Sequence, residues 1–227
     1  FEHIFYRKKI SPAIVGGDSF HRNDRINMKR AVKEALASGR NMSHFGPEAN
    51  YFNKLEALFL DYGKAGTGSY REYIHNEEEA DQHVGVQSGE FTNWEDIPTG
   101  TDLLFYEGLH GGVVHEDIDV AKHVDLLIGV VPIVNLEWIQ KIHRDTAERG
   151  YTPEAVTRTI LRRMEDYVYY ITPQFSRTDI NFQRVPTVDT SNPFIARDIP
   201  TPDESFVVIR LREPQKYAID FPYLLSM

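Results

Sequence analysis

The chain has 227 residues, of which 41% are hydrophobic and 26% charged, and this is the composition of a folded globular protein. Its 34 Asp and Glu outnumber its 25 Lys and Arg, and the formal net charge of -9 argues against nucleic-acid or anionic-membrane partners, which require a basic surface. No cysteine is present, so disulfides, thiol catalysis and thiolate metal sites are excluded from this stretch. No apolar run is long enough for a membrane helix and no secretory signal is seen, so we expect a soluble, cytoplasmic protein.

The first hundred residues predict helices around one short strand. The expected elements are an amphipathic helix that opens the chain at Phe1, a strand over 11–15, and helices over 24–38 and 48–62. Gly39 and Gly63 are expected just past the ends of the two longer helices. Residues 63–100 are acidic and rich in turn formers and show no strong periodicity.

The second half contains stronger signals. Continuous apolar runs at 103–106 and 125–134 are typical of strands covered on both faces, as in parallel α/β sheets. A helix is predicted over 136–149, and Thr152-Pro153-Glu154 begins another with a hydroxyl cap and a first-turn proline. Two late strands are expected, over 180–189 and 206–212. Because no repeat or linker interrupts this pattern, it predicts a single α/β domain over residues 1–227.

Polar residues follow three of the predicted strands. These are Asp18, Glu107 and Asn135, and ligands of open α/β sheets bind outside the carboxyl ends of strands. Glu107 is followed by Gly108, which lets backbone approach a ligand, and a carboxylate at this place commonly holds Mg²⁺ near nucleotide phosphates. The alternative is a surface carboxylate at a strand terminus.

Asp18 stands close to three groups that can bind an anion. These are His21, Arg22 and Arg25. A carboxylate here could accept a proton from a hydroxyl while the cations hold a phosphorylated substrate. The alternative is a turn or helix-cap residue, since Asp is common in both.

The helix predicted over 136–149 separates apolar from charged residues. Leu136, Ile139 and Ile142 form one face. The opposite face is expected to carry Lys141, Arg144, Asp145, Glu148 and Arg149. This face either binds an anionic ligand or is an exposed face with ion pairs such as Lys141–Asp145 and Asp145–Arg149.

Two other motifs do not support a site. Residues 63–69 (GKAGTGS) resemble a phosphate loop but lack the Gly-Lys-Ser/Thr ending and follow a helix, so we interpret them as a helix stop and loop. The nine histidines show no zinc-ligand spacing, and the Gly-x-Ser-x-Gly elbow of hydrolases is absent.

Taken together, these segments resemble phosphoribulokinases of the bacterial type over nearly the whole chain. The residues that carry the resemblance are 17–22, 103–111, 135–145, 173–176, 178–186 and 189–197. The Arg-Asp-x-x-x-Arg-Gly stretch at 144–150 is shared with the wider uridine-kinase-like group. The resemblance implies an α/β P-loop kinase fold with a mixed sheet flanked by helices in three layers. It also implies transfer of the γ-phosphoryl group of ATP, with Mg²⁺, to the C1 hydroxyl of ribulose 5-phosphate in the Calvin cycle.

The resemblance also assigns roles to residues. Asp18 would be the catalytic base, and the substrate contacts would be His21, Arg25, Tyr73, His75 and Arg149. Glu107 would be the acidic group at the metal, and Lys141, Arg144 and Asp145 would act at the transferring phosphoryl group. Arg162 and Arg163 would lie on the lid side of the nucleotide. The family type implies an octamer that responds to NADH and AMP, with Arg7 and Arg210 at effector positions.

The chain departs from the family pattern at both ends. The family's Walker A loop precedes the helix with which this sequence begins, and the family's C-terminal segment is also missing, so we expect a kinase truncated at both ends and inactive in this form. Thioredoxin control is not expected because the chain has no cysteine. Two alternatives stay open: a uridine-kinase-like nucleoside kinase, and a non-catalytic scaffold that has lost the phosphate loop.

Overall fold

The computed structural model describes residues 1–226 and divides into two compact units. The N-terminal unit comprises residues 1–125 and 163–174, and the C-terminal unit comprises residues 126–162 and those after 174. Both combine helices with strands, as predicted, and the single-domain organisation over the whole chain stays a prediction. None of the described helices is long and apolar enough to cross a membrane.

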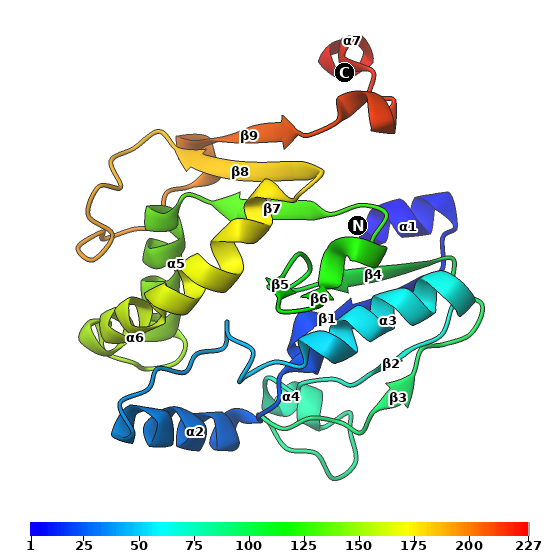
Figure 1. Ribbon diagram of the computed structural model, residues 1–227. Coiled ribbons are helices and arrows are strands. Elements are labelled where there is room, and N and C mark those ends of the chain that lie inside the picture. The colour runs from blue at the N-terminus through cyan, green and yellow to red at the C-terminus, as the bar shows by residue number, and fades with distance from the viewer. Residues whose placement is uncertain (227) are drawn as a thin grey trace. The chain divides into compact units, whose positions relative to one another are not determined.

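The N-terminal unit is built around a parallel strand pair. Its helices are α1 (Glu2–Lys8), α2 (Arg25–Ala37), α3 (Phe52–Ala65) and α4 (Glu77–Ala80), and its strands are β1 (Pro12–Gly16), β2 (Ser69–Tyr70), β3 (Glu95–Asp96), β4 (Leu103–Glu107), β5 (Val114–His115) and β6 (Ile118–Asp119). β1 and β4 run parallel, with Pro12 opposite Leu103 and Gly16 opposite Glu107 (Figure 1). The strands predicted over 11–15 and 103–106 are therefore confirmed, and they end side by side.

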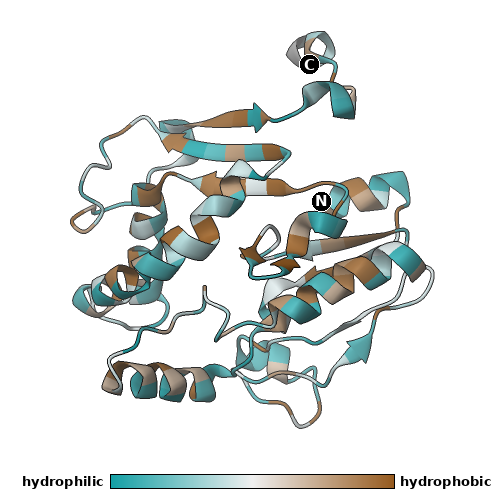
Figure 2. Cartoon of the chain, in the orientation of Figure 1, coloured by the Kyte–Doolittle hydropathy of each residue, from teal (hydrophilic) through white to brown (hydrophobic). Residues whose placement is uncertain are grey.

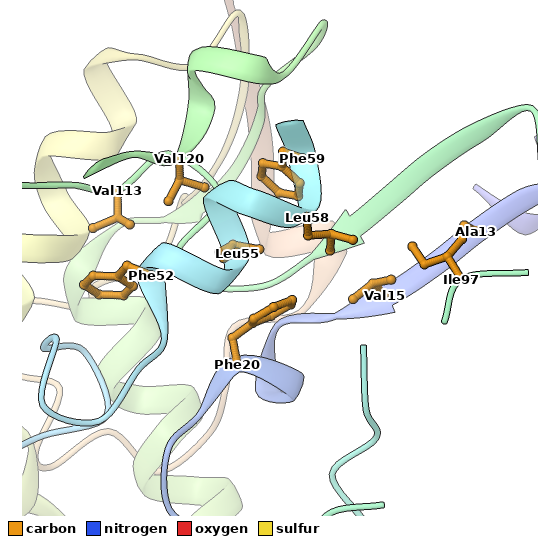
Figure 3. Packing of buried hydrophobic residues seen from close by; sticks show 10 residues of the cluster. All are labelled: Ala13, Val15, Phe20, Phe52, Leu55, Leu58, Phe59, Ile97, Val113 and Val120. Carbon is orange, nitrogen blue, oxygen red and sulfur yellow. The ribbon is translucent and has the colours of Figure 1, made fainter. Parts of the chain in front are cut away.

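Helix α3 supplies much of the core of this unit. Its polar and apolar residues alternate along the ribbon in Figure 2, and the apolar stripe packs against β1 and the loops around it. Figure 3 shows the buried cluster, whose members are Ala13, Val15, Phe20, Phe52, Leu55, Leu58, Phe59, Ile97, Val113 and Val120. Full burial of a Leu or Phe side chain contributes roughly 1.5–3 kcal/mol, so this cluster is a principal source of stability in the unit.

The start of α3 differs from its predicted start at residue 48. The chain just before it is held in an extended pairing, because Arg22 N donates to Ala49 O at 2.8 Å and Tyr51 N donates to Phe20 O at 2.8 Å. These bonds keep residues 49–51 out of the helix. At the other end, α3 continues through Gly63 and stops at Gly66, whose φ of 65° provides the left-handed C-cap.

The interpretation of residues 63–69 as a helix stop is confirmed. Gly66 caps α3, and Ser69 already belongs to β2. A Cβ atom at Gly68 would lie 2.4 Å from Leu58 Cδ1, so a larger residue here would require the Leu58 side chain to move.

The C-terminal unit contains a mixed sheet of three strands in the order β7-β8-β9. Its elements are β7 (Ile128–Pro132), α5 (Val134–Ala147), α6 (Pro153–Asp166, whose last residues belong to the N-terminal unit), β8 (Ile180–Pro186), β9 (Ser205–Leu211) and α7 (Phe221–Ser226). β7 and β8 pair in parallel, and β8 and β9 pair antiparallel. The Thr152 hydroxyl accepts a hydrogen bond from Ala155 N at 3.2 Å, which confirms the cap predicted for α6.

The prediction that Asn135 ends a strand is wrong. β7 stops at Pro132 and α5 begins at Val134, so Asn135 lies in the first helical turn. Its side-chain Nδ2 donates to Thr190 O at 2.9 Å. The Asn135 side chain therefore holds the loop that contains Thr190.

Candidate active site

Two glycines bring the chain segments after β1 and β4 into contact. A Cβ atom on Gly17 would lie 2.7 Å from Gly108 Cα, and one on Gly108 would lie 2.7 Å from Gly17 Cα. Only glycine allows so close an approach of the two backbones. Asp18 follows directly in a short 3₁₀ turn, Gly17–Phe20, and is thus fixed at the carboxyl end of the strand pair.

The Asp18 carboxylate lies between two imidazole rings. Its Oδ1 is 3.0 Å from His21 Nε2, and its Oδ2 is 3.6 Å from His75 Nε2. The hydrogen bond from His21, helped by the charges of His21 and His75, outweighs burial and holds the pKa of Asp18 below its usual value. The side chain is 45% exposed, so it is an ionised carboxylate that a ligand can reach.

A polar cavity of about 330 Å³ opens beside this carboxylate. It is lined by Ile14, Gly16, Asp18, Ser19, Tyr70, Glu72, Tyr73, Ile74, His75, Glu79, Gln82 and His83. The Tyr73 and His75 rings meet edge to face with centroids 4.9 Å apart. Three of the predicted site residues, Asp18, Tyr73 and His75, thus line one cavity, although 55 residues or more separate Asp18 from the other two along the chain.

Arg25 lies behind this wall. Its Nη2 donates to His75 O at 2.7 Å and its Nη1 donates to Ser88 Oγ at 3.2 Å, so the guanidinium supports the segment that carries His75. Arg22 is similarly engaged, since its Nε donates to Asn50 O at 2.8 Å and its guanidinium stacks on Tyr51. Among the described residues that line the cavity, neither arginine appears.

Two further histidines lie near His21: His44 is half-buried and His110 is buried. Burial, and then the charge of Arg163, lowers the pKa of His44 to about 3. Burial likewise lowers the pKa of His110 to about 4, while its Nε2 lies 3.1 Å from Phe45 O. Both rings are therefore neutral at pH 7, and His44 lies 5.4 Å from the His21 ring between centroids.

The charged residues of α5 form a second cluster, in the C-terminal unit. Asp145 is only 5% exposed, and its two oxygens contact Lys141 Nζ, Arg144 Nε at 3.2 Å and Arg149 Nη1 at 3.1 Å. Burial alone would raise the pKa of Asp145, but the hydrogen bond from Lys141 and the three positive charges outweigh it and hold that pKa below its usual value.

The predicted ion pairs of α5 are confirmed, but the predicted placement of Asp145 is wrong. It was expected on the helix face opposite Leu136, Ile139 and Ile142, whereas it is buried together with them. Asp145 lies three residues after Ile142 and so continues the buried stripe of the helix. Its burial is possible because the cations around it neutralise its charge.

Glu107 remains the candidate group for a metal. It is exposed at the end of β4, where a carboxylate oxygen of the kind that Mg²⁺ prefers faces solvent. Among the described residues, no group of three or more His, Asp or Glu is arranged to hold a metal ion. One exposed carboxylate fits a Mg²⁺ ion that is bound mainly by phosphates and water.

Comparison with known proteins gives the site its context. Residues 1–191 match the model of the phosphoribulokinase / uridine kinase family, which is more than half of the chain. The chain belongs to this family. Over its whole length it is 59% identical to a phosphoribulokinase of Nitrobacter vulgaris, covering 78% of that protein, and 60% identical to the plasmid-encoded phosphoribulokinase of Cupriavidus necator, covering 77%. The solved phosphoribulokinase from Rhodobacter spheroides superposes on the whole chain and on 78% of its own length with a TM-score of 0.90, at 55% identity.

Membership in the phosphoribulokinase / uridine kinase family agrees with the predicted α/β kinase fold.

The remaining predicted site residues of this family member lie in several elements. Arg162 and Arg163 are near the end of α6, and Arg7 is in the last turn of α1. Arg210 lies in β9 and donates to Phe175 O and to Thr178 Oγ1, so it already has structural partners.

The sequence reading missed two residues that shape the Asp18 site. Arg71 donates from Nε to Ser19 O at 3.0 Å and from Nη2 to His21 O, and it stacks on the Phe91 ring at 3.7 Å. Asn50 is 1% exposed and contacts the His21 ring. Neither belongs to a motif, and only the folded chain brings them to the site.

Proposed function

We propose that the protein transfers the γ-phosphoryl group of ATP to the C1 hydroxyl of ribulose 5-phosphate, which makes ribulose 1,5-bisphosphate in the Calvin cycle. The observation that carries this proposal is the ionised Asp18 carboxylate at a polar cavity with Tyr73 and His75. The whole chain is also similar to proteins named phosphoribulokinase. A carboxylate held beside imidazoles suits a reaction in which a sugar hydroxyl loses its proton.

The chemistry assigned to Asp18 is proton acceptance. The C1 oxygen forms a bond to the γ-phosphorus, the bond from that phosphorus to the ADP oxygen breaks, and the hydroxyl proton passes to an Asp18 oxygen. His21 and His75 hold the two carboxylate oxygens, which keeps the base ionised before substrate arrives. Positioning of the two reactants accounts for much of the rate, because phosphoryl transfer needs little covalent help from the protein.

The cations of α5 are assigned to the transferring phosphoryl group. We propose that Lys141 and Arg144 neutralise its charge, that Asp145 orders them, and that Arg149 contacts the sugar phosphate, following the family resemblance. The observed pairing of all three cations with one buried carboxylate supports the ordering role of Asp145. Arg162 and Arg163 are assigned to the nucleotide side.

ATP is proposed to bind together with Mg²⁺, and Glu107 is the residue that would hold the ion, directly or through water. A bound Mg²⁺ would supply positive charge to the β- and γ-phosphate oxygens. The exposed carboxylate at the end of β4 supports this assignment. An octameric assembly and a response to NADH and AMP through Arg7 and Arg210 follow from the family resemblance alone, and light scattering with effector titrations tests them.

The test of the proposed function is substrate choice. The complete gene product, supplied with ATP and Mg²⁺, is expected to phosphorylate ribulose 5-phosphate and not uridine, and a preference for uridine would favour the nucleoside-kinase alternative, which shares residues 144–150. Turnover of neither substrate would favour the scaffold alternative.

A further inference from the structure

His21 is held at both ring nitrogens by fixed partners. Its Nε2 is 3.0 Å from Asp18 Oδ1, and its Nδ1 is 2.6 Å from Asn50 Oδ1. The backbone supports this geometry because His21 and Asn50 face each other in an isolated antiparallel bridge. The protonation state of the ring therefore depends on what Asn50 offers to Nδ1.

The orientation of the Asn50 amide is settled by its other contacts. Its Nδ2 lies 2.8 Å from His44 O and 2.7 Å from Gly46 O, and a carbonyl oxygen can only accept hydrogen bonds. The NH₂ group must therefore point at these two carbonyls. The side-chain oxygen then faces His21, and the amide, 1% exposed, has no room to exchange this arrangement for solvent contacts.

An oxygen acceptor at Nδ1 requires a proton on that nitrogen. A neutral imidazole carries only one ring proton, so a neutral His21 would turn the Nε2 lone pair toward the Asp18 carboxylate at 3.0 Å. That contact is repulsive. Only the doubly protonated ring satisfies Asn50 and Asp18 together.

We propose that Asn50 is a positioning residue that holds a proton on His21 Nδ1, so that His21 donates to Asp18 only as an imidazolium. As a result, Asp18 has a positively charged donor beside it only while the His21 ring is doubly protonated. This inference rests on the proposed function, because it assigns Asn50 a role at the base of that reaction.

The groups that face His21 define what else can influence its charge. Asp18 faces Nε2, and the neutral rings of His44 and His110 lie behind it. The Arg71 guanidinium donates to the His21 main-chain oxygen. The His75 ring contacts the other oxygen of Asp18, with Nε2 at 3.6 Å from Oδ2. Asn50 is the group at Nδ1, and the amide is therefore the position to change.

The first measurement is the tautomer of His21 in the wild-type 227-residue chain. ¹⁵N-histidine NMR at alkaline pH, with the His21 signal assigned by its loss in His21→Gln, is expected to show the neutral ring protonated at Nδ1. A neutral ring protonated at Nε2 would overturn the proposal. This measurement needs no enzymatic activity, so it stays informative even if the proposed function fails.

The second measurement compares two variants in the complete gene product. Asn50→Leu removes the acceptor, and Asn50→Asp keeps an oxygen acceptor and adds negative charge, while both lose the NH₂ bonds to His44 O and Gly46 O. The alkaline limb of kcat/KM for ribulose 5-phosphate is expected to move about one pH unit down in Asn50→Leu and about one unit up in Asn50→Asp. If Asn50 had only a structural role, the alkaline limb would move in the same direction in both variants, and that result would overturn the proposal.

Gln174→Leu is the matched control. Gln174 is also buried, and its amide makes three bonds to main-chain atoms, donating to Leu109 O and Tyr170 O and accepting from Gly112 N. Like Asn50, it is buried and bonded to two carbonyl oxygens, but none of its three bonds involves His21. We expect Gln174→Leu to lower stability and leave the alkaline limb in place. If Asn50→Asp does not fold, the wild-type tautomer and the limb of Asn50→Leu against this control still decide.

Discussion

Asp18 and Asp145 are both ionised carboxylates with lowered pKa values, but they are kept ionised in different ways. Asp18 is half exposed in the N-terminal unit and is held by two imidazoles, which can lose their charge. Asp145 is buried in the C-terminal unit and is held by one Lys and two Arg, which keep their charge at any physiological pH. The first arrangement leaves a carboxylate able to accept a proton, and the second produces a permanently charged cluster in which the three cations outnumber the one carboxylate.

This difference indicates separate tasks for the two residues. A proton acceptor must be reachable by its substrate, and the groups that hold it must be able to let go of it when their own charge changes. An ordering residue must instead resist protonation, so that its cations stay in place. This difference in roles can be tested by changing either carboxylate to its amide, which has nearly the same shape but no charge.

The largest expected effect is on turnover in Asp18→Asn. Loss of the proton acceptor is expected to lower kcat of the complete gene product by about 10²–10⁴-fold, the usual contribution of general base catalysis. Stability should change little, because the side chain is 45% exposed and an amide can still bond to His21. Steady-state kinetics and urea unfolding measure the two effects.

Asp24→Asn is the control for this variant. Asp24 caps α2, with Oδ1 accepting from Asn27 N at 2.7 Å, and asparagine caps helices equally well. It also lies outside the cavity lining. An equal fall in kcat for the two variants would contradict the role of Asp18 as base.

The next effect is on stability in Asp145→Asn. Removing this charge takes away the carboxylate that Lys141, Arg144 and Arg149 share, and the lost charged hydrogen bonds should cost about 2 kcal/mol. The cost should fall on the C-terminal unit, where Trp138 lies, and Trp138 fluorescence in a Trp94→Phe background follows it during urea unfolding. Glu148→Gln, an exposed carboxylate on the same helical region, should cost less than about 0.5 kcal/mol. Equal costs would show that Asp145 is not stabilised by its cations.

The third effect is the pH dependence of stability, and it should separate the two units. His44 and His110 titrate at about 3 and about 4 when folded but near 6.5 when unfolded. The unfolded state therefore binds more protons between these values, and the N-terminal unit should lose stability as pH falls from 6.5 toward 4, by about 1.4 kcal/mol per pH unit for each ring.

Asp145 has the opposite pH window. Its folded pKa lies below its usual value, so its contribution is complete above about pH 4 and is lost as the pH falls through the lowered value. As the pH is lowered from 7 to 4, the urea midpoint reported by Trp94 in the N-terminal unit should therefore fall before the midpoint reported by Trp138 in the C-terminal unit. His44→Gln should reduce the pH dependence of the unfolding free energy that Trp94 reports. The same pH dependence of the unfolding free energy at both tryptophans would contradict this separation.

Local signals made most of the secondary structure predictable. The apolar runs at 103–106 and 125–134 and the Thr152 cap each report on adjacent residues, and the structure contains the expected strands and helix start. Errors arose where distant segments decide the outcome. The start of α3 was misplaced because residues 49–51 pair with residues 20–22 instead of joining the helix.

The site was predictable in part for the same reason. Asp18 could be found because it follows a strand, and the resemblance to known kinases added Tyr73 and His75. The burial of Asp145 was missed because it was grouped with the other charged residues of its helix, and a charge is buried only where its partners converge. Asn50 was missed because its function depends on two carbonyl oxygens and one imidazole nitrogen that no sequence pattern brings together.

The smallest expected effect concerns the individual cations around Asp145. The Arg149 side chain is 53% exposed, so the pair it forms with Asp145 at 3.1 Å is weakened by water and should contribute less than about 1 kcal/mol. Lys141 is less exposed and should couple more strongly to the same carboxylate. Double-mutant cycles that combine Asp145→Asn with Arg149→Gln or with Lys141→Met, measured by urea unfolding, give the two coupling energies. If the Arg149 coupling equals or exceeds the Lys141 coupling, burial does not rank these pairs, and the contrast between a solvent-reachable Asp18 and a shielded Asp145 weakens with it.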